Sequence, residues 1–164
     1  MIAATLRSLF VEGLHDIRDA DRRLVMALPR MAREATSGGL REALERRIDL
    51  TEDHMSRLAG VYASINESPR AKTSKAMVGL LEEGDELMRL EGPPSVRDSA
   101  LIAAALRLDH YGMATYGCLR LWAEILGERY AEQLLRKSYD GGVSGERALM
   151  AVAASLHEET SRSR

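Results

Sequence analysis

The apolar residues of this chain recur at alternating intervals of four and three in four long stretches, and this spacing restricts the possible fold strongly. The first seam consists of Leu6, Phe10, Leu14, Ile17, Asp21, Leu24, Leu28 and Met31, and its intervals alternate from Phe10 onward. Asp21 is its single polar member. A seam with this spacing follows one face of an α-helix and marks the line along which the helices of a bundle pack. The sequence therefore predicts an all-α protein.

Three further seams have the same spacing. They are Leu44, Ile48, Thr51, Met55, Leu58, Tyr62 and Ile65; Leu101, Ala105, Leu108, Gly112, Thr115, Leu119, Trp122 and Leu126; and Ala131, Leu135, Ser138, Gly142, Gly145, Leu149, Val152 and Leu156. A shorter apolar segment lies between the second and third of the four. Together the patterns predict helices over about 5–34, 39–65, 74–90, 96–126 and 128–158. We expect one domain over residues 1–164, a four-helix bundle with an extra crossover helix.

Turn and capping residues separate these helices. Thr36 and Ser37 offer capping hydroxyls between the first two helices, and two consecutive prolines after Gly92 stop the short one. Ser95 precedes Asp98 by three residues, which predicts a variant of the capping box. The seam of the last helix stays in phase through Gly141 to Gly145, so we expect one continuous helix with a weak centre.

Composition excludes several classes of protein. The formal net charge of -2 gives no basic field for nucleic acid, so no nucleic-acid partner is expected. A single cysteine, Cys118, excludes an intramolecular disulfide, and its place in mid-helix favours a buried, inert thiol. Arg7 and Glu12 interrupt the N-terminal apolar stretch, and no apolar run approaches the ~18 residues of a membrane span. We therefore expect a cytoplasmic protein without a membrane partner.

Polar or small residues interrupt each seam near its middle. They are Asp21, Thr51 and Gly112, followed by Ser138 with Gly142 and Gly145. In a four-helix bundle these positions face one another at a similar depth, where some bundle proteins place a di-metal site. The other explanation is that small residues simply permit close approach of the helices. The spacing is compatible with both.

Several stretches carry a more specific signal. They are DIRDADRRLVMALPRMA at 16–32, GLLEEGDELM at 79–88, VRDSALIAAALRLDHYGMATYG at 96–117 and LRLWAEILG at 119–127. In this order they resemble the YciE/YciF-type ferritin-like family over roughly residues 5 to 140. The resemblance implies a ferritin-like four-helix bundle with an extra helix. It also implies a stress-associated role and a ferroxidase-like metal site.

The chain departs from the acidic pattern that this resemblance implies. Asp21 stands where the family has Glu on the first helix, and Arg47 and Leu50 stand in place of His and Glu on the second. Val78 replaces a Glu of the short helix, and the EHYE stretch becomes Asp109, His110, Tyr111 and Gly112. Asp140, Gly141, Gly142 and Val143 occupy the Glu-rich centre of the last helix. Two divalent cations need several carboxylates, so the ring of ligands is depleted.

These departures favour a non-enzymatic, metal-free bundle protein with a stress-related or structural role. No catalytic or cofactor-binding residue is predicted. The alternative is an iron- or manganese-binding, ferroxidase-like oxidase that uses a residual site of Asp21, His54 and Asp109. We also expect a homodimer, as the family resemblance implies and as apolar residues outside the main seams suggest. These residues are Leu50, Val61, Ile102 and Met113.

The remaining polar residues give further expectations. Asp21 should be buried and either protonated or paired with Arg47, His54, Thr51 or Tyr116, because an unpaired buried carboxylate is costly. His54 should hydrogen-bond Asp21 or lie at the surface. His15 and His157 should be exposed, and His110 should point away from its seam. Tyr116 and Trp122 should lie in the core.

Overall fold

Five helices make up the part of the chain that the computed structural model describes, which is the backbone of residues 5–162 and the side chains of residues 5–156. They are α1 (Leu6–Glu34), α2 (Gly38–Ser64), α3 (Lys75–Met88), α4 (Pro94–Ile125) and α5 (Arg129–Arg162). No strand occurs within these described residues. The prediction of an all-α fold is confirmed, and each described helix begins and ends within four residues of its predicted bounds.

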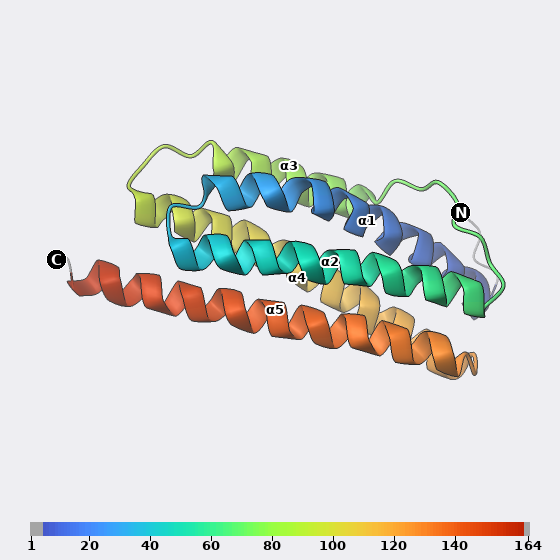
Figure 1. The fold of residues 1–164 in the computed structure, drawn as a ribbon. Coiled ribbons are helices and arrows are strands. Elements are labelled where there is room, and N and C mark those ends of the chain that lie inside the picture. The colour runs from blue at the N-terminus through green and yellow to red at the C-terminus, as the bar shows by residue number, and fades with distance from the viewer. Residues whose placement is uncertain (1–4, 163–164) are drawn as a thin grey trace.

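The four long helices lie side by side along one axis (Figure 1). α1 packs against α2 and α4, and α5 packs against the same two helices. α2 and α4 are therefore diagonal neighbours across the core, as are α1 and α5. The short helix α3 lies on the outside of α4 and α1. It follows a long connection after α2, and this is the expected crossover.

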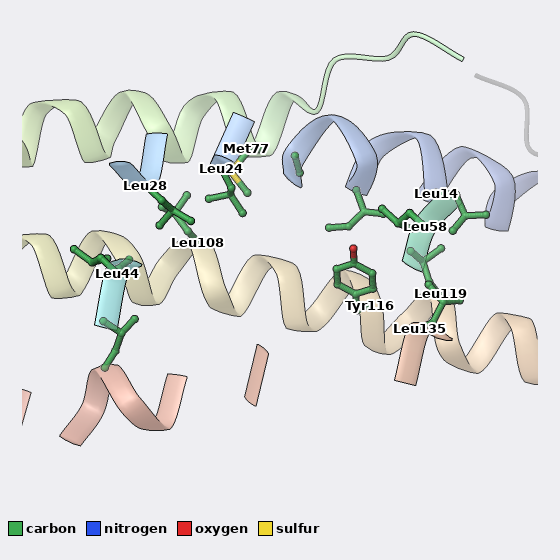
Figure 2. Close-up of a cluster of buried hydrophobic side chains, with 14 of the residues drawn as sticks. Leu14, Leu24, Leu28, Leu44, Leu58, Met77, Leu108, Tyr116, Leu119 and Leu135 are labelled. Carbon is green, nitrogen blue, oxygen red and sulfur yellow. The ribbon is translucent and has the colours of Figure 1, made fainter. Parts of the chain in front are cut away.

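A continuous apolar core fills the bundle, and leucines from the long helices and Met77 of α3 contribute to it (Figure 2). The first seam is buried from Phe10 to Met31, as predicted. On α2 the buried face differs from the predicted seam: Ile48 and Met55 are partly exposed, whereas Arg47 and His54 are buried. The series Leu44, Arg47, Thr51, His54 and Leu58 also alternates intervals of three and four, so spacing alone allows this face as well.

The predicted capping box at Ser95 is wrong. α4 begins at Pro94, a position that proline favours because its missing N–H needs no partner in the first turn. Asp98 is buried and reaches the turn between α1 and α2. Its carboxylate accepts hydrogen bonds from the backbone N–H groups of Thr36 at 2.8 Å and Ser37 at 2.7 Å, and from the Thr36 hydroxyl at 2.8 Å. Ser37 itself caps α2, as expected.

α5 is one continuous helix through its glycines, as predicted. Gly142 is buried, and a Cβ atom there would lie 2.9 Å from Cγ of Met113 on α4. A residue with a side chain would therefore displace Met113. Gly142 allows α5 to approach α4 closely at mid-bundle. This packing contact offsets the low helix propensity of glycine.

Some single-residue expectations are wrong. Cys118 is exposed, because it lies on the side of α4 that faces away from the core. Val61 and Ile102 are core residues, so they offer no apolar surface to a second subunit. His110 is exposed, as its position predicted, and its Nε2 lies 3.3 Å from Oε1 of Glu146. The side chain of His157 lies outside the described residues.

Over the part of the chain that the structure describes, none of the helices is long and apolar enough to cross a membrane.

Candidate functional site: a polar cluster at the centre of the bundle

Six polar side chains lie together in the middle of the core, and Thr51 of α2, whose hydroxyl donates to the Arg47 backbone carbonyl, is buried between two of them in sequence. We call them the central polar cluster, and they are Asp21 of α1, Arg47 and His54 of α2, Asp109 and Tyr116 of α4, and Ser138 of α5. Each of these residues is buried, with at most 4% of its total surface, backbone included, exposed. The cluster thus draws on all four long helices at the depth where the sequence places its seam interruptions.

An ion pair between Arg47 and Asp109 connects the diagonal helices α2 and α4. Nε of Arg47 donates a short hydrogen bond to Oδ1 of Asp109. The side chains are 5% and 3% exposed, so both charges are withdrawn from water. Burial raises the pKa of the Asp109 carboxyl more than the neighbouring Arg47 lowers it. The guanidinium therefore lies in the core with one carboxylate as its charged partner.

Asp21 pairs with Tyr116, one of the four partners expected from the sequence. The Tyr116 hydroxyl donates a hydrogen bond of 2.5 Å to Oδ2 of Asp21. Burial raises the pKa of Asp21 to about 7, against the opposing effects of this hydrogen bond and of the Arg47 charge. Burial and the Asp21 carboxylate together raise the pKa of Tyr116 well above its ordinary value. The prediction that Asp21 is buried and paired is confirmed.

His54 is buried and contacts Tyr116, so the two predicted alternatives for it are both wrong. Its ring meets the Tyr116 ring edge-on, with centroids 5.0 Å apart and planes at 64°. Burial lowers the pKa of His54 to about 3, helped by the charges of Arg47 and Arg57, although the nearby Ser138 backbone opposes the shift. The imidazole is therefore neutral at physiological pH.

The glycines of α5 provide the space for the α2 side chains of the cluster. A Cβ atom at Gly145 would lie 3.4 Å from Cδ of Arg47, and one at Gly141 would lie 3.4 Å from Nε2 of His54. These glycines are one helical turn apart and face the same side of α2. The Glu-poor centre of α5 thus packs directly against Arg47 and His54.

The central polar cluster does not fit a metal centre in this arrangement. Asp21 and Asp109 bind Tyr116 and Arg47, respectively, and Arg47 adds a fixed positive charge. Among the described residues, no three His, Cys, Asp or Glu side chains form a group that could hold a metal ion. The residual site of Asp21, His54 and Asp109 stays a prediction that metal loading can test. The pairing of Arg47 with Asp109 was not predicted, and its only signal in the sequence is a basic residue on the second face of α2 that has alternating spacing.

Comparison with known proteins identifies the family. Residues 5–161 match a family described as a domain of unknown function, DUF892. The chain belongs to the DUF892 family. It is 35% identical to Protein YciF of Escherichia coli (strain K12) over 138 residues, which cover 83% of this chain and 82% of YciF. The resemblance to the YciE/YciF-type family is therefore confirmed.

Solved structures agree with this assignment. The crystal structure of the E. coli stress protein YciF superposes with a TM-score of 0.92 at 31% identity, covering 94% of this chain and 98% of that one. YcfI from Rhodopseudomonas palustris, described as a "putative structural protein", superposes with a TM-score of 0.86 at 29% identity over 91% and 97% of the two chains. The DUF892 chain thus has the ferritin-like helical bundle of YciF.

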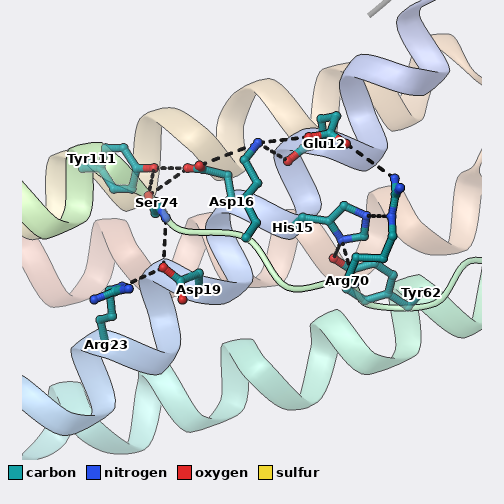
Figure 3. A network of polar contacts seen from close by, with 10 residues as sticks. Glu12, His15, Asp16, Asp19, Arg23, Tyr62, Arg70, Ser74 and Tyr111 are labelled. Carbon is teal, nitrogen blue, oxygen red and sulfur yellow. Dashed lines mark hydrogen bonds and ion pairs between the residues drawn. The ribbon is translucent and has the colours of Figure 1, made fainter. Parts of the chain in front are cut away.

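A second polar network in this DUF892 chain holds the crossover against α1 and α4 (Figure 3). The Ser74 hydroxyl donates to Oδ2 of Asp16 at 2.9 Å, and the Ser74 N–H donates to Oδ2 of Asp19 at 2.9 Å. The Tyr111 hydroxyl donates a short hydrogen bond to Asp16 as well. Each of these groups has a protein partner, so the network has a structural role: it holds the segment before α3 against α1 and α4.

His15 belongs to the same region and is buried, contrary to the expectation that it is exposed. Its Nδ1 lies 2.8 Å from the Tyr62 hydroxyl, and the two rings stack with centroids 5.6 Å apart. The crossover also brings Nε of Arg70 to 3.3 Å from Nε2 of His15. Burial, followed by the Arg70 charge, lowers the pKa of His15. The crossover thus covers a histidine that the helix pattern alone placed in solvent.

Proposed function

We propose that this DUF892 protein is a non-enzymatic bundle protein with a stress-related or structural role, in which a buried ion pair has replaced a di-metal site. The observation that carries the proposal is the Arg47–Asp109 pair inside the central polar cluster. The relatives support the coarser statement, since YciF is a stress protein and YcfI is described as structural. The family resemblance places a histidine where this chain has Arg47.

Electrostatics supports a metal-free centre. A divalent cation in the core must be offset by several carboxylates, because desolvation of the ion is costly. The cluster has two carboxyl groups, of which Asp109 is already neutralised by Arg47 and Asp21 has a pKa of about 7. A guanidinium cannot ligate a metal and repels a cation placed beside it. The chain therefore already carries a positive charge of its own at this centre.

Metal loading tests this proposal directly. Protein purified without chelator would be incubated anaerobically with Fe(II) or Mn(II), desalted and assayed for bound metal, and its melting temperature would be compared with that of the untreated protein. We expect substoichiometric metal and no rise in melting temperature, because nothing in the folded state binds the ion preferentially. The matched control is Asp21→Asn, which removes a carboxylate that any residual site needs. Stoichiometric binding that Asp21→Asn abolishes would establish the iron- or manganese-dependent alternative.

We also propose that the protein forms a homodimer. Val61 and Ile102 do not support it, but Leu121 and Ile125 lie one turn apart on α4 and are 48% and 72% exposed. Near this face a groove of about 420 Å³ between α1 and α4 is lined by Leu9, Cys118 and Trp122. Light scattering should give the mass of two chains, and Ile125→Glu should give that of one. Met26→Glu, at an exposed position on α1, is the control that should stay dimeric.

A further inference from the structure

Gly112 is buried on α4 and yet lies beside open space. A Cβ atom built on it would meet no other atom within 4 Å, apart from its own helix backbone and chain neighbours. The other buried glycines of the bundle centre differ: a Cβ atom at Gly142 or Gly145 would contact Met113 or Arg47. The core therefore contains a hollow at this position that the surrounding side chains do not fill.

The hollow lies between two layers of the central polar cluster. On α4, Gly112 is about one turn from Asp109 on one side and from Tyr116 on the other. Asp109 pairs with Arg47 in the first layer, and Tyr116 contacts His54 in the second. Arg47 and His54 are about two turns apart on α2, so both helices place a turn of chain between the layers. Along α4 the hollow thus lies between the turn that carries Asp109 and the turn that carries Tyr116.

Four buried atoms of these two layers have no hydrogen-bond partner among the described residues. They are Nη1 of Arg47, Oδ2 of Asp109, Nε2 of His54 and Oγ of Ser138. Leaving such an atom unpaired in a core is costly, and more so for a charged group. Atoms of this kind in native proteins are ordinarily satisfied by ordered water when the protein offers no partner.

We propose that the hollow beside Gly112 is a binding site for buried water, in which one or more water molecules hydrogen-bond the unpartnered atoms of Arg47, Asp109, His54 and Ser138. These atoms include a donor, an acceptor and a hydroxyl that can be either, and water both donates and accepts. The charges of Arg47 and Asp109 compensate each other, so neither an anion nor a cation is favoured. The inference rests on the hollow and on the unpartnered atoms, and it holds independently of the proposed function.

The experiment counts long-lived internal water by ¹⁷O magnetic relaxation dispersion in the wild-type protein and in Gly112→Leu. We expect a dispersion amplitude of at least one water molecule in the wild type, and a loss of at least that amount in the variant, because leucine fills the hollow. The matched control is Gly79→Leu, an exposed position on α3 where a side chain also meets nothing. The control should keep the full amplitude.

A second variant covers the case in which Gly112→Leu does not fold. Arg47→Met with Asp109→Leu removes two of the four unpartnered atoms and keeps similar side-chain volume, so it should lower the amplitude as well. A wild-type protein without long-lived water would overturn the proposal, as would an amplitude that is unchanged in the folded variants. A bromide ion located beside Gly112 by anomalous scattering would also overturn it, because an anion would then be the ligand.

Discussion

Asp21 and His54 are buried together, and burial drives the pKa of each toward the value that favours its neutral form. The pKa of Asp21 rises from 3.8 to about 7, so its contribution to stability is full below pH 4 and is lost as the pH rises toward 7. The pKa of His54 falls from 6.5 to about 3, so its contribution is full above pH 6.5 and is lost as the pH falls toward 3. Between about pH 4 and 6.5 the two contributions oppose each other.

When either residue is replaced by a group that does not ionise, the pH dependence of stability that remains should be that of the other residue. We expect Asp21→Asn to gain stability over the wild type as the pH rises from 4 to 8, by up to ~4 kcal/mol, since asparagine can still accept the Tyr116 hydrogen bond and never ionises. His54→Gln should show the reverse, with its largest gain near pH 4. Urea unfolding across this range measures both differences. Parallel pH profiles for wild type and Asp21→Asn would contradict the raised pKa.

Removing one partner of the Arg47–Asp109 pair should lower the free energy of unfolding strongly, whereas removing both partners should lower it little. Arg47→Met alone leaves Asp109 buried without its partner, for which we expect a loss of about 3–5 kcal/mol in the free energy of unfolding. The double variant with Asp109→Leu should recover most of this loss, because no buried charge remains. A double-mutant cycle measures the coupling. Equal losses in the single and double variants would show that the pair contributes through packing and not through charge.

At the scale of the elements, Asp98 explains how α4 holds the turn between α1 and α2. Asp98→Ala leaves two partly buried backbone N–H groups, those of Thr36 and Ser37, without their acceptor. We expect a loss of about 2–4 kcal/mol in unfolding free energy. Ser95→Ala is the control and should stay within ~0.5 kcal/mol, since Ser95 makes no cap. A comparable loss for Ser95→Ala would show that Ser95 does cap α4, as the sequence predicted.

We predict that the glycines make the centre of α5 its least stable part. We expect hydrogen exchange to show early opening of residues 140–144, and Gly142→Ala to gain little, because its new Cβ atom must move Met113. Gly79→Ala on the exposed face of α3 meets nothing and should gain about 0.5–1 kcal/mol. Uniform protection across α5 would show that packing against α2 and α4 outweighs the glycine propensities.

At the scale of the whole molecule, the bundle should accept a metal centre once its centre is rebuilt. The family resemblance suggests Asp21→Glu, Arg47→His, Leu50→Glu, Asp109→Glu and Gly112→Glu together. The hollow beside Gly112 gives the new carboxylate room, whereas glutamate at Gly142 would collide with Met113. Without metal the acids repel one another and the variant should be unstable, and Fe(II) or Mn(II) should raise its melting temperature.

The control for this rebuilding keeps Arg47 and changes only the other four positions. Its guanidinium should pair with the new carboxylates and oppose cation binding, so metal should raise its melting temperature much less. A five-position variant that folds well and does not respond to metal would show that these positions do not converge on one volume.

The sequence alone determined where the helices lie, that they form one bundle, and that Asp21 is buried, because helical periodicity and breaking residues are local properties of the chain. Tertiary packing decided the rest. Two different faces of α2 have the same alternating spacing, and contact with the glycines of α5 selects the one that carries Arg47 and His54. Asp109 lies 62 residues from Arg47 in sequence, and Asp98 lies 62 from Thr36, so neither pairing leaves a local pattern. These contacts exist only once the helices have packed, since side chains distant in sequence meet only in the assembled core.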